Sequence, residues 1–438
     1  MRILKGALSI AFLVFASFLL STGCGDGTNE QVEVDAGCED AFCIGTLFRT
    51  SDSPSSVIKA AELARDDINE AGGNIKLIAG DGATPLASTM ELLEMGVKAI
   101  IGPGTSQSSV EIFDFLVENG LVAVSPSATS VTLTEKNREI SQAGKAHFFF
   151  RTVPTDSFQA KILATEVRNG DEVLIVHRND NYGVKLTELI NREFLSRNRP
   201  AAKVVWYERY YSDDPMFEEK TQAVLDDIEA VGGIGNIGSI ILILSIDEGG
   251  KIIKGMLDST VVSSAARYYI SDSFAVENLY ERVDPDNPAA VEGFKSTTPC
   301  SLPDPPERKD EFEKRFDREM FPSLRFAVHA YDAVVAVALA ALSAGSNDPS
   351  EYVSEMAEVT AGENRCLTYA ECAAALMDET AANDDINYEG VSGPIEFDEN
   401  GDIGAGCYSV YTYDAEGGRT RQVFSVPDLE DITTDRVP

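Results

Sequence analysis

Residues 97–130 read VKAIIGPGTSQSSVEIFDFLVENGLVAVSPSATS and repeat one simple pattern. Lys98–Ile101 and Leu121–Val124 are short, largely apolar runs of strand length, each followed by small or polar residues. Between these runs, apolar residues recur at the spacing of one helix face: Val110, Phe113, Leu116 and Val117. A strand, a helix and a second buried strand in this order predict a parallel sheet with helices on both faces.

The same alternation continues on both sides of this stretch. Toward the N-terminus, strands are predicted at Cys43–Leu47 and Ile75–Ile78, with a helical stripe beginning at Val57 and a helix beginning at Pro85. A second series follows Arg151, and its predicted strands are Val173–Val176, Lys203–Tyr207, Ser239–Leu244 and Tyr268–Ile270. Because two such series rarely merge into one sheet, we expect an α/β protein with two doubly wound, Rossmann-like lobes.

The C-terminal part returns to helices and ends in strands. Asn400-Gly401 predicts a turn between the last two strands. No stretch after the first 23 residues is expected to be long and apolar enough to span a membrane. The predicted elements are helices at Phe312–Arg318, Ala327–Leu342 and Pro349–Val359, and strands at Pro394–Phe397 and Tyr408–Tyr413.

The N-terminus resembles a bacterial export signal. Residues 1–23 combine two early basic residues with an apolar run over residues 7–20, which is short for a membrane span. Leu20-Ser21-Thr22-Gly23-Cys24 resembles a lipoprotein cleavage box, in which Cys24 becomes the lipid-modified first residue. The alternative is an ordinary secretory leader that is cut nearby. Residues 24–42 are largely polar and acidic, which predicts a flexible tether.

Cysteine usage agrees with export. Six cysteines remain besides Cys24, and an even number in an exported chain predicts three disulfides. The sequence does not assign their pairing. Cys38 with Cys43 and Cys366 with Cys372 would close short loops, which leaves Cys300 with Cys407. A few buried free thiols are the alternative.

The charge balance excludes one class of partner. The chain has 36 basic and 72 acidic residues, a net charge of −36, and 44% of its residues are hydrophobic. A negative charge of this size repels nucleic acid and anionic membrane surfaces. We therefore expect a soluble body that contacts the membrane only through its lipid anchor.

Motifs for cofactors and catalysis match only in part. Gly233–Gly238 has the spacing G-x-G-x-x-G but precedes a predicted strand, whereas a dinucleotide-binding loop follows one. No Cys-x-x-Cys pair exists and the three histidines are scattered, which argues against zinc. Neither Ser106 nor Ser127 has a histidine placed as its base, which argues against a hydrolase. We expect no cofactor, no metal and no enzymatic activity.

Two polar loops at the ends of adjacent strands carry the candidate site. Gly104-Thr105-Ser106 follows one strand and opens a helix, and Ser125-Pro126-Ser127-Ala128-Thr129 follows the next. In open α/β sheets ligands bind at these strand ends, and hydroxyl groups with a helix N-terminus suit a carboxylate. The alternative is local: Ser106 as an N-cap and Ser125-Pro126 as a turn.

From about Cys43 to Tyr413 the chain resembles the type I periplasmic binding proteins, especially the branched-chain amino acid receptors of ABC transporters. The segments that carry the resemblance are Ile100–Pro103, Ser125–Thr129, His147–Pro154, Asn181–Gly183, His329–Ala333 and Val391–Asp402. The resemblance implies two lobes joined by three crossovers, near Arg151-Thr152, Ser296–Thr298 and Asn400–Asp402. Lobe one would hold residues 43–152 and 298–400, and lobe two residues 153–297 and 401–438.

The resemblance also implies ligand-binding positions. Ser106, Ser127 and Thr129 fall on positions that bind an amino acid's carboxylate and ammonium, and Tyr182 falls on an aromatic position of lobe two. The acid that pairs with the ammonium has no direct match, because Ser273 occupies its position and Asp272 precedes it. Ile246 stands at another aromatic position.

The implied function is the capture of a small polar ligand by hinge closure for an ABC importer, with an ABC permease as partner. The ligand would be an amino acid or a related carboxylate. The alternative is a lipid-anchored sensor that works without a permease. In both cases the protein would lie on the periplasmic face of a bacterial membrane. Because Gly25 rather than aspartate follows Cys24, that membrane can be the outer one.

Overall fold

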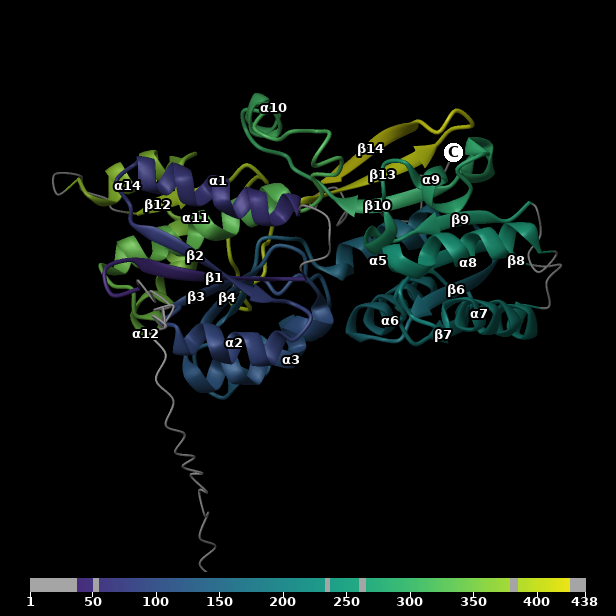
Figure 1. Ribbon diagram of the computed structural model, residues 1–438, viewed down its shortest axis with the longest axis horizontal. Helices are drawn as coiled ribbons and strands as arrows, with labels where there is room; N and C mark the ends of the chain where they lie inside the picture. Colours follow the sequence, from purple (N-terminus) through teal and green to yellow (C-terminus); the bar gives the residue numbers. More distant parts are fainter. Residues whose placement is uncertain (1–37, 50–54, 233–236, 260–264, 379–384, 426–438) are drawn as a thin grey trace, which may run out of the picture. The chain divides into compact units, whose positions relative to one another are not determined.

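The computed structural model describes residues 38–49, 55–232, 237–259, 265–378 and 385–425. The predicted leader and residues 24–37 of the predicted tether, including Cys24, lie outside these residues, and so do residues 233–236 of the glycine-rich motif. The described part contains two large sheets flanked by helices and one small two-stranded sheet (Figure 1). The prediction of an α/β fold built on two doubly wound sheets is confirmed.

The first sheet has five parallel strands in the order β2-β1-β3-β4-β5. We call this sheet, with the helices packed on it, the first lobe. Helix α1 lies on one side of β1 and β2, and α2 and α3 lie on the other (Figure 1). The strands are β1 (Phe42–Phe48), β2 (Ile75–Asp81), β3 (Ala99–Ile101), β4 (Val122–Ser125) and β5 (Phe149–Arg151), and the helices between them are α1 (Ser56–Glu70), α2 (Pro85–Glu94), α3 (Ser106–Asn119) and α4 (Val131–Gln142).

The sequence explains where α3 begins and ends. Thr105 is its N-cap, and the side-chain oxygen accepts a hydrogen bond from the backbone N–H of Ser108 at 3.1 Å. Gly120 ends the helix with φ 61°, a left-handed conformation that glycine adopts without strain. The apolar face is buried in the core of the first lobe. Because α3 begins shortly after β3 ends, its first turn lies near the carboxyl end of β3.

The second sheet has seven strands in the order β14-β13-β10-β9-β8-β6-β7. We call this sheet and its helices the second lobe. Neighbouring strands from β10 to β7 are parallel, whereas β13 and β14 pair antiparallel at the other edge. The strands are β6 (Glu172–Arg178), β7 (Lys203–Tyr207), β8 (Ile237–Ile243), β9 (Arg267–Ile270), β10 (Lys295–Pro299), β13 (Cys407–Tyr413) and β14 (Arg419–Ser425).

Helices cover both faces of this second sheet. Successive residues of β6 alternate between two apolar clusters, with Leu174 in one and Ile175 in the other. The first cluster includes residues of α7 and α8, and the second includes residues of α5 and α6. The helices are α5 (Asp156–Glu166), α6 (Asn181–Ser196), α7 (Phe217–Gly232), α8 (Ile246–Asp258) and α9 (Leu279–Val283), with short 3-10 turns at Asp272–Phe274 and Pro288–Val291.

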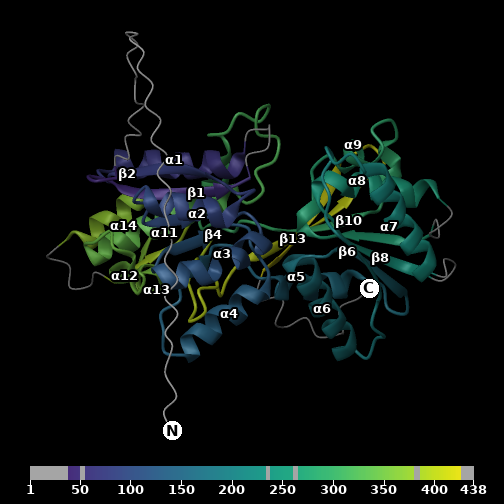
Figure 2. The same cartoon turned by 60° about the horizontal axis from the view of Figure 1, so that its bottom comes forward.

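The C-terminal helices return to the first lobe. Helix α11 (Ala327–Ala344) packs against α1, α12, α13 and α14, and Figure 2 shows it beside the last three. Contrary to expectation, α11 is long and apolar enough to cross a membrane, but 83% of it is buried, as in a core helix. The other elements here are α10 (Glu307–Glu313), α12 (Pro349–Tyr352), α13 (Glu355–Ala361), α14 (Tyr369–Leu376), β11 (Asn364–Cys366) and β12 (Ile386–Tyr388).

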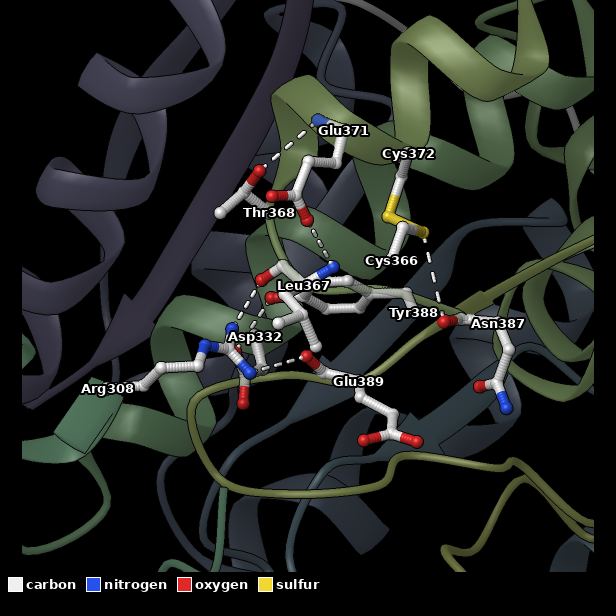
Figure 3. The surroundings of a disulfide bond; sticks show 10 residues. All are labelled: Arg308, Asp332, Cys366, Leu367, Thr368, Glu371, Cys372, Asn387, Tyr388 and Glu389. Atoms are coloured by element: carbon white, nitrogen blue, oxygen red, sulfur yellow. Dashed lines mark hydrogen bonds between the residues drawn. A yellow bond between two sulfur atoms is a disulfide. The ribbon is translucent and has the colours of Figure 1, made fainter. Parts of the chain in front are cut away.

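Three disulfides are present, as predicted: Cys38–Cys43, Cys300–Cys407 and Cys366–Cys372. The first and third close short loops, and the second joins the end of β10 to the start of β13. Figure 3 shows the third, where the Arg308 guanidinium donates to the carbonyl oxygens of Leu367 and Glu389. This arginine holds the loop that the disulfide closes against the segment after β12.

Three predicted elements are wrong. Pro394–Phe397 is not a strand but forms two isolated bridges, because the chain turns at Asp398, whose carboxylate accepts hydrogen bonds from the N–H groups of Asn400 and Asp402. The predicted helix Pro349–Val359 is interrupted between α12 and α13. The predicted helix Phe312–Arg318 is shifted toward the N-terminus, as α10, because it starts directly after Pro306.

Candidate ligand-binding site

One pocket collects all six residues that the sequence placed in a binding site. Its volume is about 600 Å³, and residues of both lobes line it. Such a volume suits a small molecule. The six predicted residues are Ser106, Ser127, Thr129, Tyr182, Asp272 and Ser273.

The loop after β3 presents Ser106 in the first turn of α3. Ser106 is buried, and its Oγ accepts a hydrogen bond from the backbone N–H of Ser130 at 3.1 Å. The proposed alternative of Ser106 as N-cap is therefore wrong, because Thr105 takes that role. Among the described residues, no acceptor lies within hydrogen-bond distance of the Ser106 hydroxyl hydrogen, so this hydrogen can point to a ligand in the pocket.

The loop after β4 is tied to the loop after β3 by hydroxyl groups. Ser125 donates to the carbonyl oxygen of Pro103 at 2.7 Å and accepts from the N–H of Ala128 at 3.0 Å. Ser127 donates to the carbonyl oxygen of Gly104 at 3.0 Å. Thr129 is buried and lines the same pocket. These bonds hold the two hydroxyl-bearing loops in one fixed arrangement.

Arg151 at the end of β5 supports the second loop from behind. Its side chain is fully buried and its Nε lies 2.6 Å from Asp402 Oδ1. The guanidinium also donates at 2.9 Å to the carbonyl oxygens of Ala128 and Ser130. An arginine from β5 and an acid close to β13 thus fix the backbone on both sides of Thr129.

Tyr182 and Asp272 form the wall of the pocket on the second lobe. Asp180 caps α6 and places Tyr182 in the first turn, where the ring is buried. The Tyr182 hydroxyl donates to Asp272 Oδ1. Burial, together with the negative charge of Asp272, raises the pKa of Tyr182 well above its usual value, so the hydroxyl stays protonated.

Ser273 is less available than Asp272. Its hydroxyl donates to the carbonyl oxygen of Leu244 at 2.6 Å and lies 3.1 Å from the Ser271 hydroxyl. Behind this wall Asp156 is fully buried at the start of α5. Burial and the charge of Asp272 raise the pKa of Asp156 well above its usual value. Of these two neighbouring acids, Asp272 lines the pocket and Asp156 does not.

A family model described as the receptor family ligand binding region matches residues 57–416. The chain belongs to this family. A Leu/Ile/Val-binding protein homolog 1 of Brucella melitensis is 26% identical over 318 residues, which cover 69% of this chain and 78% of that protein. 

Solved structures share the fold of this receptor-family chain. The leucine binding protein LivK from Thermotoga maritima superposes with a TM-score of 0.64 at 18% identity, over 89% of this chain and 100% of that one. The branched-chain amino acid substrate binding protein LivJ from Streptococcus pneumoniae, in complex with isoleucine, gives 0.62 at 20% identity, over 88% and 99%. The fold is that of type I periplasmic binding proteins.

The pocket of this receptor-family chain also contains residues that the sequence did not single out. Four arginines line it, namely Arg49, Arg178, Arg209 and Arg325. Tyr211 and Phe326 line it as well. Ile246, which the resemblance already placed at an aromatic position of the site, also lines the pocket, at the start of α8. Arg209 and Tyr211 follow β7 directly, so the rule that ligands bind at strand ends could have found them. Arg325 follows no strand, and no sequence signal marks it.

Proposed function

We propose that this chain is an extracytoplasmic solute-binding protein that captures a small amino acid or a related carboxylate for an ABC importer. The observation that carries the proposal is one pocket with two kinds of polar group. Neutral hydroxyls of Ser106, Ser127 and Thr129 lie on the first lobe, and the Asp272 carboxylate lies on the second. The match to a Leu/Ile/Val-binding protein homolog supports the same class of ligand.

In this proposal the first lobe binds the ligand's carboxylate. The Ser106 and Thr129 hydroxyls and the N-terminal turn of α3 stabilise a negative charge without a buried lysine. The Ser127 hydroxyl donates its one hydrogen to Gly104 and so fixes the loop beside them. The Asp272 carboxylate accepts a hydrogen bond from the ligand's ammonium group, and the Tyr182 hydroxyl donates to Asp272 and holds it in place. The second lobe, residues 153–297 and 401–438, then closes on the first lobe, residues 43–152 and 298–400, by a hinge at the three crossovers. The closed form is the one that an ABC permease would accept.

The role of Asp272 can be tested with Asp272→Asn. The amide keeps an oxygen for the Tyr182 hydroxyl but removes the charge that pairs with an ammonium. Affinity for α-amino acids should fall by at least about tenfold, whereas affinity for carboxylic acids without an amino group should not fall. Calorimetric titration of both ligand classes checks this.

The exposed Asp286 offers a matched control, since Asp286→Asn removes the same charge outside the pocket. An equal loss of affinity for both ligand classes in Asp272→Asn would show that the substitution damages the pocket instead of an ammonium site.

We also propose that Cys24 is lipid-modified and anchors the protein to a bacterial membrane, with the ligand-binding body on its periplasmic face. The support comes from residues 1–24, which combine a basic start, an apolar run and a cysteine after small residues. A Cys24→Ala variant should leave the membrane fraction and appear in the soluble extract. Fractionation with immunodetection measures this, and a variant that stays with the membrane would rule out the anchor.

A further inference from the structure

The charges around the pocket do not match a ligand with an aliphatic side chain. Four arginines and three aspartates line the pocket, although acidic residues outnumber basic ones twofold in the whole chain. The aspartates are Asp213, Asp247 and Asp272. Ile246 and Phe326 are the apolar side chains of the lining besides two tyrosines. A leucine or isoleucine side chain would gain little apolar contact here, since burial against apolar groups is what stabilises it.

Two of the four arginines, Arg178 and Arg49, already contact other side chains of the chain. The Nε of Arg178 lies 2.7 Å from Asp180 Oδ2, and its Nη1 donates to the Ser245 hydroxyl at 3.1 Å. Arg49 is exposed, and its guanidinium stacks 3.9 Å from the centre of the Tyr211 ring. Arg178 therefore supports the pocket wall, and Arg49 lies at its exposed rim.

Arg325 differs from Arg178, because no acidic side chain among the described residues pairs with its charge, and from Arg49, because it is not exposed. It lies directly before α11, half-buried, and its Nη1 donates to the backbone carbonyl oxygen of Asp272. Among the described residues, no carboxylate lies within 4.0 Å of this guanidinium, and the Asp272 carboxylate is bonded to Tyr182. Burial lowers the pKa of Arg325, yet an arginine stays charged in a protein. Its remaining N–H donors are left for a group in the pocket.

Arg209 supplies a second cation that lines the pocket. Its Nη2 lies 3.4 Å from Asp247, and its guanidinium lies 4.8 Å from the centre of the Tyr211 ring. The hydrogen bond to Asp247 is long and uses only one of the N–H groups of Arg209, so other N–H groups remain to donate to an acceptor in the pocket.

We propose that the ligand carries a second anionic group, which Arg325 and Arg209 bind, so that the ligand class is a dicarboxylate such as an acidic amino acid. This inference rests on the proposed function, in which the hydroxyls of the first lobe hold the first carboxylate. The planar guanidinium of Arg325 can pair with a carboxylate through two parallel hydrogen bonds. The specificity-determining residue is then Arg325.

The test compares acidic amino acids with their neutral counterparts. Calorimetric titrations of the purified chain use L-glutamate, L-aspartate, L-glutamine and L-leucine. The native chain should bind one acidic amino acid at least about tenfold more tightly than L-glutamine or L-leucine. Arg325→Gln should remove this preference by weakening the acidic ligand at least about tenfold. Arg192→Gln is the control, because it removes the same charge at an exposed position of α6 outside the pocket.

The possible outcomes distinguish the second anionic site from the proposed amino acid-binding function on which it rests. A native chain that binds L-leucine or L-glutamine as tightly as the acidic amino acids overturns the second anionic site and leaves the proposed function standing. An acidic preference that survives Arg325→Gln overturns the assignment to Arg325. Failure to bind any of the four amino acids counts against both the inference and the amino acid-binding function.

Discussion

Replacing Asp402 with alanine is expected to destabilise the protein by about 3–5 kcal/mol, because it leaves a buried arginine without its counter-ion. Arg151 is fully buried, and Asp402 Oδ1 lies 2.6 Å from its Nε. Asp402 Oδ2 also accepts a hydrogen bond from the Thr134 hydroxyl at 2.6 Å. The substitution therefore removes the acceptor of the fully buried Arg151 and that of the partly buried Thr134. Chemical unfolding of native and variant chains measures the difference.

An exposed ion pair provides the matched control for this substitution. Lys136 and Asp114 lie 2.9 Å apart, with the Asp114 side chain 79% exposed. Asp114→Ala should cost less than about 1 kcal/mol, because water screens such a pair. A cost below about 1 kcal/mol for Asp402→Ala would show that the pair contributes no more than a surface one. A double variant Arg151→Met/Asp402→Leu should recover stability relative to Asp402→Ala.

The Arg151–Asp402 pair also connects the folding stability of the chain with the geometry of the ligand-binding site. Arg151 holds the carbonyl oxygens of Ala128 and Ser130, on both sides of Thr129, while Asp402 lies just before β13 of the second lobe. One buried contact therefore fixes both the loop that carries Thr129 and the last segment of the chain that runs from the first sheet to the second. An Asp402→Ala chain that still folds should bind ligand more weakly, because the Thr129 loop loses its support.

The sequence predicts best those helices and strands whose pattern of apolar residues reflects burial in a core. Lys203–Tyr207 is predicted with the observed bounds, and the helix predicted at Ala327–Leu342 ends two residues later. Strand β14 was missed because it lies at the sheet edge, where most of Arg419–Ser425 is polar and exposed. The break between α12 and α13 was also missed, because Val353 and Ser354 carry no glycine or proline signal.

Three of the six predicted site residues could also be found from the pattern of buried strands. Ser106, Ser127 and Thr129 lie in loops that follow apolar strands, so their convergence follows from a parallel sheet. The resemblance added Tyr182 and Asp272, which lie in the same pocket. Arg325 could not be found, because a segment far from these loops in the sequence brings it to the pocket. Long-range packing of α11 against α1 places that segment, and no local pattern encodes it.

In the proposed site, we expect Ser106 and Thr129 to contribute most directly to the binding of the ligand's carboxylate. Each hydrogen bond to a charged carboxylate contributes about 1.5–3 kcal/mol, and about 1.4 kcal/mol is a tenfold change in affinity. Both hydroxyls line the pocket, and both residues are nearly fully buried, so water competes weakly for them. Ser106→Ala also leaves the Ser130 N–H without its acceptor, so the folding stability of each variant must be measured beside its affinity.

A Ser106→Ala/Thr129→Ala variant is therefore expected to bind the ligand well over tenfold more weakly than the native chain, as measured by calorimetric titration. The control is Ser109→Ala/Thr132→Ala, which removes the same two kinds of hydroxyl from α3 and α4 outside the pocket. Its affinity should stay near the native value even if its stability falls. Unchanged affinity in the Ser106 and Thr129 variant would place the binding site elsewhere, whatever the ligand is. A loss confined to that variant ties the ligand's carboxylate to the carboxyl ends of β3 and β4.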